Sequence, residues 1–139
     1  MNPEQRFESL AVAGLAELER LADRILATGV EVRVVAGPEA ASAPVQFPVP
    51  GTADTTAVLG HVALSTCTVE LSGVRGDGVR DGRDLTGAVA AAVCDAEAER
   101  GGPFAGDVDA LCAAALHCQV EDAKNRAGLV AATRLGVGQ

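Results

Sequence analysis

The residues of this chain that could do chemistry gather in one segment, residues 82–96, which reads GRDLTGAVAAAVCDA. A glycine, Arg83 and Asp84 ahead of an alanine-rich run suit a phosphate-binding turn, a catalytic Arg–Asp pair or a capped helix start. A helix start explains most of the pattern. Gly82 permits a positive φ angle, and the Asp84 carboxylate suits the free N–H groups and the positive dipole end of a first helical turn. Arg83 alone is left without a role.

A phosphate loop is the weaker interpretation, because Asp84 occupies the place of an anion and no Walker-type lysine follows. The preceding GVRGDGVRDG has G-x-x-G-x-G spacing, but aspartates follow its glycines and would repel phosphate. Asp95 comes eleven residues after Asp84, or about 16 Å along a helix, which is too far for a catalytic carboxylate pair.

Other catalytic sets are incomplete. Ser65 lacks the flanking glycines of a nucleophile elbow, and His61 opens a predicted strand whereas His117 lies inside a predicted helix. Cys112, His117 and Cys118 are close in sequence, but small buried thiols on an alanine-rich helix explain them better than a metal site does. We therefore expect no complete active site, and no metal or cofactor bound by this chain alone.

The elements that must position these residues begin with a helix. Asn2 can cap it, Pro3 suits its first position, and apolar residues then recur at helical spacing. The pattern predicts one amphipathic helix over about residues 3–28, which Gly29 ends.

Four strands are predicted next. VEVRVVAG alternates as a half-buried strand, APVQFPVPG alternates but contains prolines that suit only a sheet edge, and GTADTTA is typical of a loop. HVALSTCTVELSG predicts a strand covered on both faces, joined through the Ser72-Gly73 turn to a glycine-rich hairpin partner, VRGDGVRDG.

Two helices complete the predicted order. One starts near Asp84 and ends at Gly101-Gly102, with a buried stripe composed of Leu85, Ala88, Val89, Ala92 and Ala96. The other starts with Asp107 as its cap, and the tail LVAATRLGVGQ fits either its continuation or a short strand. We predict a single domain, residues 1–139, of α+β class: an N-terminal helix, a largely antiparallel sheet of about four strands, and two C-terminal helices.

Composition limits the partners. The chain has no Trp or Tyr and three Phe, so its core must use small side chains that each bury little area at about 25 cal/mol per Å². A partner surface would complement such a core. A formal net charge of −8 argues against nucleic acid. No apolar run reaches the length of a membrane span, and no signal peptide or C-x-x-C pair is present, so we expect a cytoplasmic protein.

Segment 82–96 also resembles the G-R-D-x-x-x-A-x-x-x-A-x-x-D-A signature of the PhnG family, a small subunit of the bacterial carbon–phosphorus lyase system. Three further segments are similar to the family: RFESLAVAGLAELERL from Arg6, LGHVALSTCTVEL from Leu59 and ATRLGV from Ala132. The chain departs from the family pattern at His61, Arg80-Asp81, Gly87 and Gly136, which replace a Glu, an apolar pair, a His and an Asp.

The resemblance implies a cytoplasmic complex with PhnH, PhnI and PhnJ subunits and the ATP-binding-cassette-like PhnL, together with self-association in that complex. It implies transfer of an alkylphosphonate to the ribose C1 of ATP, the co-substrate, with loss of adenine. The product is ribose 1-alkylphosphonate 5-triphosphate, whose carbon–phosphorus bond the radical-SAM subunit PhnJ breaks later. It places the nucleosidase-type chemistry in PhnI. The family-motif residues of this chain are then structural or interface residues: Gly82, Arg83, Asp84, Asp95 and Arg134.

Two alternatives stay open. The chain could be a stand-alone α+β domain that binds a small ligand or regulates, with a pocket between helix 3–28 and the sheet. It could also be a small enzyme that uses His61, Arg83 and Asp84 together.

Overall fold

The computed structural model describes residues 2–48 and 56–137. In chain order its elements are α1 (Pro3–Val12), α2 (Leu15–Leu26), β1 (Val32–Pro48), β2 (Thr56–Leu71), β3 (Val74–Asp81), α3 (Leu85–Glu99) and α4 (Ala105–Val137). The strands form an antiparallel sheet in the order β1-β2-β3. The predicted α+β class and antiparallel sheet are confirmed, with three strands in the described residues where about four were predicted.

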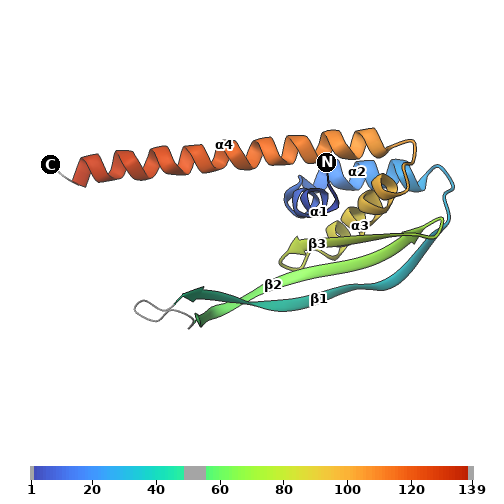
Figure 1. Ribbon diagram of the computed structural model, residues 1–139, viewed down its shortest axis with the longest axis horizontal. Helices are drawn as coiled ribbons and strands as arrows, with labels where there is room; N and C mark the ends of the chain where they lie inside the picture. Colours follow the sequence, from blue (N-terminus) through green and yellow to red (C-terminus); the bar gives the residue numbers. More distant parts are fainter. Residues whose placement is uncertain (1, 49–55, 138–139) are drawn as a thin grey trace.

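The molecule has a packed body and two projecting arms (Figure 1). In the body, α3 lies against the sheet, and α1, α2 and the first part of α4 pack around α3. One arm is the far end of the β1–β2 hairpin and the other is the second half of α4, and both extend in the same direction from the body (Figure 1). No helix among residues 2–48 and 56–137 combines the length and the apolar character needed to cross a membrane.

The predicted single helix over residues 3–28 is wrong in one respect, because the chain breaks it at Gly14, the N-cap of α2. The break is stabilised by Arg80 of β3, whose Nη1 donates hydrogen bonds into the end of α1. The acceptors are the backbone carbonyls of Leu10 (3.1 Å), Ala11 (3.2 Å) and Ala13 (2.6 Å). Terminal carbonyls of a helix lack intrahelical donors, and the guanidinium supplies them. At the other end of α1 the predicted cap is confirmed, since Asn2 Oδ1 accepts from the Gln5 N–H at 2.7 Å.

The two predicted N-terminal strands are one long strand, β1, which pairs with β2 from Val32 opposite Leu71 to Pro48 opposite Thr56. The strand pairing is irregular near Ala36 and after Val45, where the register shifts, and these bulges let the two predicted strands continue as one. Pro44 and Pro48 lie at a sheet edge as predicted, because β1 is an outer strand, and Pro50 falls outside the described residues. Most of the predicted loop 51–57 falls outside the described residues, and its last two residues belong to β2.

The β2–β3 hairpin turns at Ser72-Gly73 as predicted, with φ angles of 50° and 83° that suit a primed two-residue turn. The glycines of β3 serve packing against α3. A Cβ atom on Gly76 or Gly78 would collide with the backbone of α3, at the carbonyls of Ala92 and Ala88 respectively. The glycine-rich strand and the alanine-rich helix are therefore the two sides of one close contact.

The core consists of small and medium apolar side chains from α2, β2, α3 and α4, with Leu10 from α1. Within the stripe predicted for α3, Ala88, Ala92 and Ala96 are fully buried, as predicted. Val89 is half-buried, but Leu85 is 42% exposed, so its predicted burial is wrong. Leu85 is exposed because α3 begins at the edge of the body, beside an open groove.

The helix α4 begins at Ala105, so Asp107 lies in its first turn and the predicted cap at Asp107 is wrong. Its tail continues as helix to Val137, which excludes the short strand. Val108, Cys112 and Ala115 are its buried residues, and beyond Ala115 no described side chain of α4 is buried.

Candidate functional site

The motif turn at residues 82–84 is fixed onto β2 by a buried serine. Gly82 has a φ of 69°, and its N–H donates to the Ala63 carbonyl at 2.8 Å. The Ser65 hydroxyl donates to the Gly82 carbonyl at 2.7 Å and accepts from the Asp84 N–H at 2.9 Å. Ser65 is fully buried. Its role is to hold the strand-to-helix turn in place, which sequence reasoning missed when it considered the serine only as a nucleophile.

Asp84 caps α3, as the sequence predicts. Its Oδ1 accepts from the Gly87 N–H at 3.0 Å, and its Oδ2 accepts from Arg80 Nε at 2.9 Å. A Cβ atom on Gly87 would meet this carboxylate, so the small residue at that departure from the family pattern leaves room for the cap. Both carboxylate oxygens of Asp84 are therefore engaged in contacts that hold the fold together.

Arg80 is the residue that sequence reasoning missed most clearly, since it appeared only as a replacement for an apolar residue. Its side chain is 11% exposed and joins the Asp84 cap to the carbonyl end of α1. No local pattern signalled this role, because Arg80 lies in a strand and its partners belong to the start of α3 and the end of α1. Arg83 differs completely, because it is exposed and makes no hydrogen bond or ion pair with the residues that the structure describes.

A second cluster surrounds Asp95, away from the Asp84 cap. Arg6 Nε donates to Asp95 Oδ1 at 2.7 Å, and Arg6 Nη2 donates to Glu99 at 2.6 Å. Asp95 Oδ2 accepts a hydrogen bond from the backbone N–H of Asp77 at 2.9 Å. Asp77 lies in β3, which is an outer strand of the sheet, so Asp95 pairs with a backbone group at the free edge of that strand. Burial disfavours the charged form of Arg6, but its hydrogen bonds and charge interactions with Asp95 and Glu99 outweigh burial and raise its pKa above the ordinary value.

The cysteines and histidine of α4 are not brought together. Cys112 is buried, and its Sγ lies 4.0 Å from the Arg6 carbonyl, whereas His117 and Cys118 are exposed. Burial raises the pKa of Cys112 to about 11, and that of Cys94 on α3 to about 12. Both thiols are therefore protonated and unreactive at neutral pH. The described residues contain no group of three potential metal ligands.

The remaining motif positions lie in the arms. His61 pairs through its backbone with Pro44 in the hairpin, and Arg134 and Gly136 fall near the end of α4. The side chains at these positions lie outside the described part of the chain. A joint site of His61, Arg83 and Asp84 thus stays a prediction, although the Asp84 carboxylate is already engaged twice.

Two hollows adjoin the clusters. A cavity of about 500 Å³ lies between α1 and the sheet, where the stand-alone alternative would have its pocket, and Thr68, Asp77 and Asp95 are polar residues in its walls. The Asp77 carboxylate already accepts from Thr68 Oγ1 at 2.6 Å and pairs with Arg75 at 3.3 Å.

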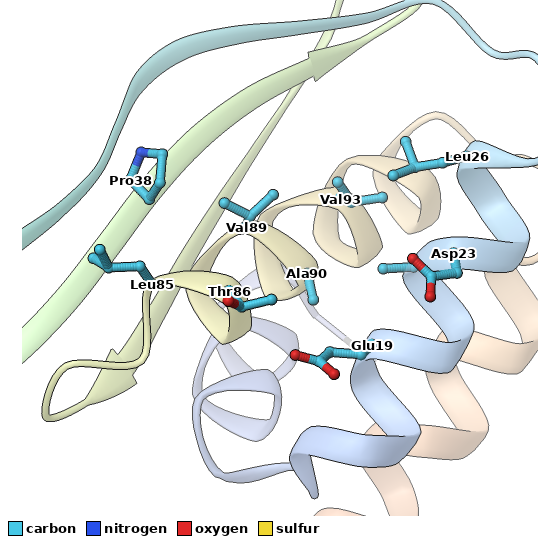
Figure 2. Close-up of a pocket in the computed structure, with 10 residues that line it drawn as sticks. Glu19, Asp23, Leu26, Pro38, Leu85, Thr86, Val89, Ala90 and Val93 are labelled. Carbon is cyan, nitrogen blue, oxygen red and sulfur yellow. The ribbon is translucent and has the colours of Figure 1, made fainter.

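The other hollow is a groove of about 430 Å³ between α2, β1 and α3. Figure 2 shows Leu85, Val89 and Val93 following one another along α3, with Pro38 on the β1 side. Glu19 and Asp23 lie on the α2 side of the same groove (Figure 2). The groove is therefore apolar along α3 and acidic along α2.

The comparisons with known proteins give one family. A family model described as phosphonate metabolism protein PhnG matches residues 2–136, which is nearly the whole chain. A comparison with curated proteins finds no match.

Proposed function

The chain belongs to the PhnG family of phosphonate metabolism, and on that premise we propose that it is an accessory subunit of the complex that transfers an alkylphosphonate to the ribose C1 of ATP. Adenine leaves in this reaction, and the product is ribose 1-alkylphosphonate 5-triphosphate. The partners are PhnI-, PhnH- and PhnJ-like subunits and a PhnL-like ATPase. The match over residues 2–136 is the observation that carries the proposal.

The roles of the motif residues support an accessory rather than a catalytic part. The Asp84 and Asp95 carboxylates hold α1, β3 and α3 together through Arg80 and Arg6, so neither is free to act as an acid or base. Arg83 is exposed beside the Asp84 cap and is available for a partner subunit. We assign the nucleosidase-type chemistry to the PhnI-like subunit and ATP binding to the assembled complex.

The shape of the chain supports a place in an assembly. The β1–β2 hairpin and the second half of α4 both leave the packed body in one direction (Figure 1). Residues 117–121 and Lys124 on α4 are all exposed, and Val120 among them is 52% exposed. Long projecting elements with exposed apolar residues are typical of chains that acquire part of their packing from partners.

The test is reconstitution with the PhnI-, PhnH- and PhnJ-like subunits and the PhnL-like ATPase encoded in the same genome. We expect the chain to co-purify with the PhnI-like subunit, and adenine release from ATP with methylphosphonate to require its presence. Arg83→Ala should weaken co-purification without changing the thermal stability of the isolated chain, whereas Arg33→Ala, an exposed control on β1, should leave both unchanged. Equal adenine release with and without the chain would refute the proposal.

One observation favours a second candidate, a small-ligand-binding domain: the cavity of about 500 Å³ between α1 and the sheet, which has Thr68, Asp77 and Asp95 in its walls. A ligand there would raise the melting temperature of the isolated chain. A screen of phosphonates and nucleotides by thermal shift measures this, and no shift with any of them would remove this candidate.

A further inference from the structure

The groove between α2, β1 and α3 is an apolar hollow that the described residues leave uncovered. Leu85, at the first position of α3, and Leu26, at the last position of α2, both line it. They are 42% and 38% exposed. Figure 2 shows Val89 between Leu85 and Val93 along α3, with Pro38 on the β1 side. Large apolar side chains that gather in a hollow, rather than being scattered, mark a surface on which another chain can dock.

The apolar surface continues onto β1, beyond α3. Val32 and Val34 of β1 are 40% and 52% exposed. They pair with Leu71 and Val69 of β2, which are fully buried. Because directly paired strand residues share a face of the sheet, the two valines lie on the face that carries the core of the body. A further helix beside α3 and over β1 would cover them.

The walls of the groove favour a helix as the occupant. The backbone groups of α2 and α3 are hydrogen-bonded within each helix, and Pro38 of β1 has no N–H to offer. An extended segment in this groove would therefore bury its own N–H and C=O groups without partners, whereas a helix satisfies them internally. The stretch from Leu85 to Val93 measures about 12 Å along α3, so an occupant that fills it has about two helical turns or more.

The charge of the occupant follows from the α2 wall. Glu19 is half-buried, and Asp23, one turn later, is exposed. Neither carboxylate forms an ion pair with any side chain that the structure describes. None of the described residues that line the groove is basic. A docked chain would remove water from both carboxylates, which costs free energy unless positive charges replace it. The occupant should therefore have Lys or Arg on the side that faces α2 and apolar residues on the side that faces α3.

A second copy of this chain does not fit that description. The buried faces of α1, α2 and α3 already form its own core, and its formal net charge is −8. We infer that the groove between α2, β1 and α3 binds a basic amphipathic helix of a different chain, one of the partner subunits. The inference rests on the proposed function for the existence of those subunits, and it adds the face of the contact and the chemistry of the helix.

Binding of the full chain to the reconstituted PhnI-, PhnH- and PhnJ-like subunits, measured by biolayer interferometry, tests this inference. Glu19→Lys/Asp23→Lys should weaken binding by about tenfold or more, because like charges then oppose each other. Leu85→Glu should weaken it similarly, because it places a charge in the apolar contact. The affinity of the wild-type chain should also fall as the salt concentration rises. Unchanged affinity in either variant would overturn the inference.

Each variant has a matched control. Leu15 occupies the first position of α2 and is 40% exposed, so Leu15→Glu makes the Leu85→Glu change at an equivalent position outside the groove. Glu4→Lys/Glu8→Lys makes the same double charge reversal at the same spacing on exposed residues of α1. Both controls should bind as the wild-type chain does, and circular dichroism shows whether every variant is folded. Controls that lost binding equally would also overturn the inference, since the effect would then not belong to the groove.

A photocrosslink identifies the occupant even if one of these variants unfolds. Thr86 is exposed and lines the groove, so p-benzoylphenylalanine in its place captures what lies there. In the assembled complex we expect a crosslink to a partner-subunit segment that has apolar residues at helical spacing and Lys or Arg beside them. A crosslink to a second copy only, to an acidic or extended segment, or to no chain at all would overturn the inference.

The outcomes separate this inference from the proposed function. If adenine release requires the chain but Leu85→Glu binds the subunits normally, the inference is wrong and the proposed function stands. If adenine release is equal with and without the chain but the photocrosslink to a basic helix forms, the inference is retained and the proposed function is refuted.

Discussion

Two arginines, Arg6 buried and Arg80 largely shielded from water, connect α1 to opposite ends of α3, and they do so with different partners. Arg80 joins the last carbonyls of α1 to a single carboxylate, Asp84, at the start of α3. Arg6 joins the first turns of α1 to two carboxylates, Asp95 and Glu99, near the end of α3. The Arg80 guanidinium donates mainly to backbone carbonyls, whereas the Arg6 guanidinium donates to two charged carboxylates.

Because the partners differ, removal of each arginine leaves a different set of carboxylates and carbonyls without a donor. Without Arg6, the buried Asp95 carboxylate keeps only the Asp77 N–H, and Glu99 faces it without a counter-ion. Without Arg80, Asp84 still accepts from the Gly87 N–H, and its side chain is 22% exposed to water. An uncompensated charge costs more free energy the less water reaches it, so the Arg6 end is the more fragile of the two.

The largest effect is expected for Arg6→Leu, which keeps much of the volume but removes the charge. We expect it to lower the free energy of unfolding by about 4 kcal/mol, as for a buried ion pair that loses one partner. Urea denaturation followed by circular dichroism measures the change. Adding Asp95→Asn should recover part of the loss, and an equal or greater loss in the double variant would contradict this account.

Arg80→Leu should cost less, about 2 kcal/mol, because the α1 carbonyls that it leaves lie at a helix end and Asp84 retains its cap. Hydrogen exchange should rise at the end of α1 and the start of α2 more than at the end of α3. A loss as large as that of Arg6→Leu would remove the distinction between the two ends.

Substitutions of Asp84 distinguish its role as a helix cap from its ion pair with Arg80. Asp84→Asn retains a capping oxygen and should lose less than Asp84→Ala, for which we expect about 1–2 kcal/mol. In an Arg80→Leu background the two variants should differ only by the cap, since the charge then has no partner. Equal effects of Asn and Ala would show that the ion pair with Arg80, and not the cap, dominates.

The smallest expected effect is a loss of stability at alkaline pH, caused by the buried thiols of Cys94 and Cys112 near the Arg6 end of the body. Raised pKa values of about 12 for Cys94 and about 11 for Cys112 mean that both stay protonated in the folded chain. The unfolded thiols ionise near pH 9, so stability is constant below that range and falls as the pH rises toward the folded values. Between pH 7 and 9 we expect a loss below about 1 kcal/mol. Cys94→Ala/Cys112→Ala should flatten this dependence, and an unchanged slope would contradict it.

Sequence reasoning reached local features more readily than tertiary ones. The Asp84 cap, the Ser72-Gly73 hairpin and the Ala88–Ala92 face follow from rules that involve neighbours in the chain, and the structure contains them. The break at Gly14 depends on Arg80, a residue far away in the sequence. The apolar spacing stays helical on both sides of Gly14, so the sequence pattern predicted one continuous helix there.

The candidate site shows the same limit. Asp95 was noted for its spacing from Asp84, yet its partners Arg6 and Asp77 come from two other elements. Leu85 is exposed because it lies beside the open groove between α3 and β1. No local pattern in the alanine-rich run could predict how α3 is placed on the sheet. The PhnG family resemblance, in contrast, needed only the motif residues themselves and is confirmed over residues 2–136.

The direct contact of Gly76 and Gly78 with the backbone of α3 has a mechanical consequence. No layer of side chains separates the strand from the helix there, so no rotamer change can absorb a displacement between them. A push on the exposed start of α3, next to Arg83, would move β3 with it. The β2–β3 hairpin would carry that movement into β1 and the hairpin arm. Strand β3 and helix α3 are therefore expected to move as one unit in this part of the body.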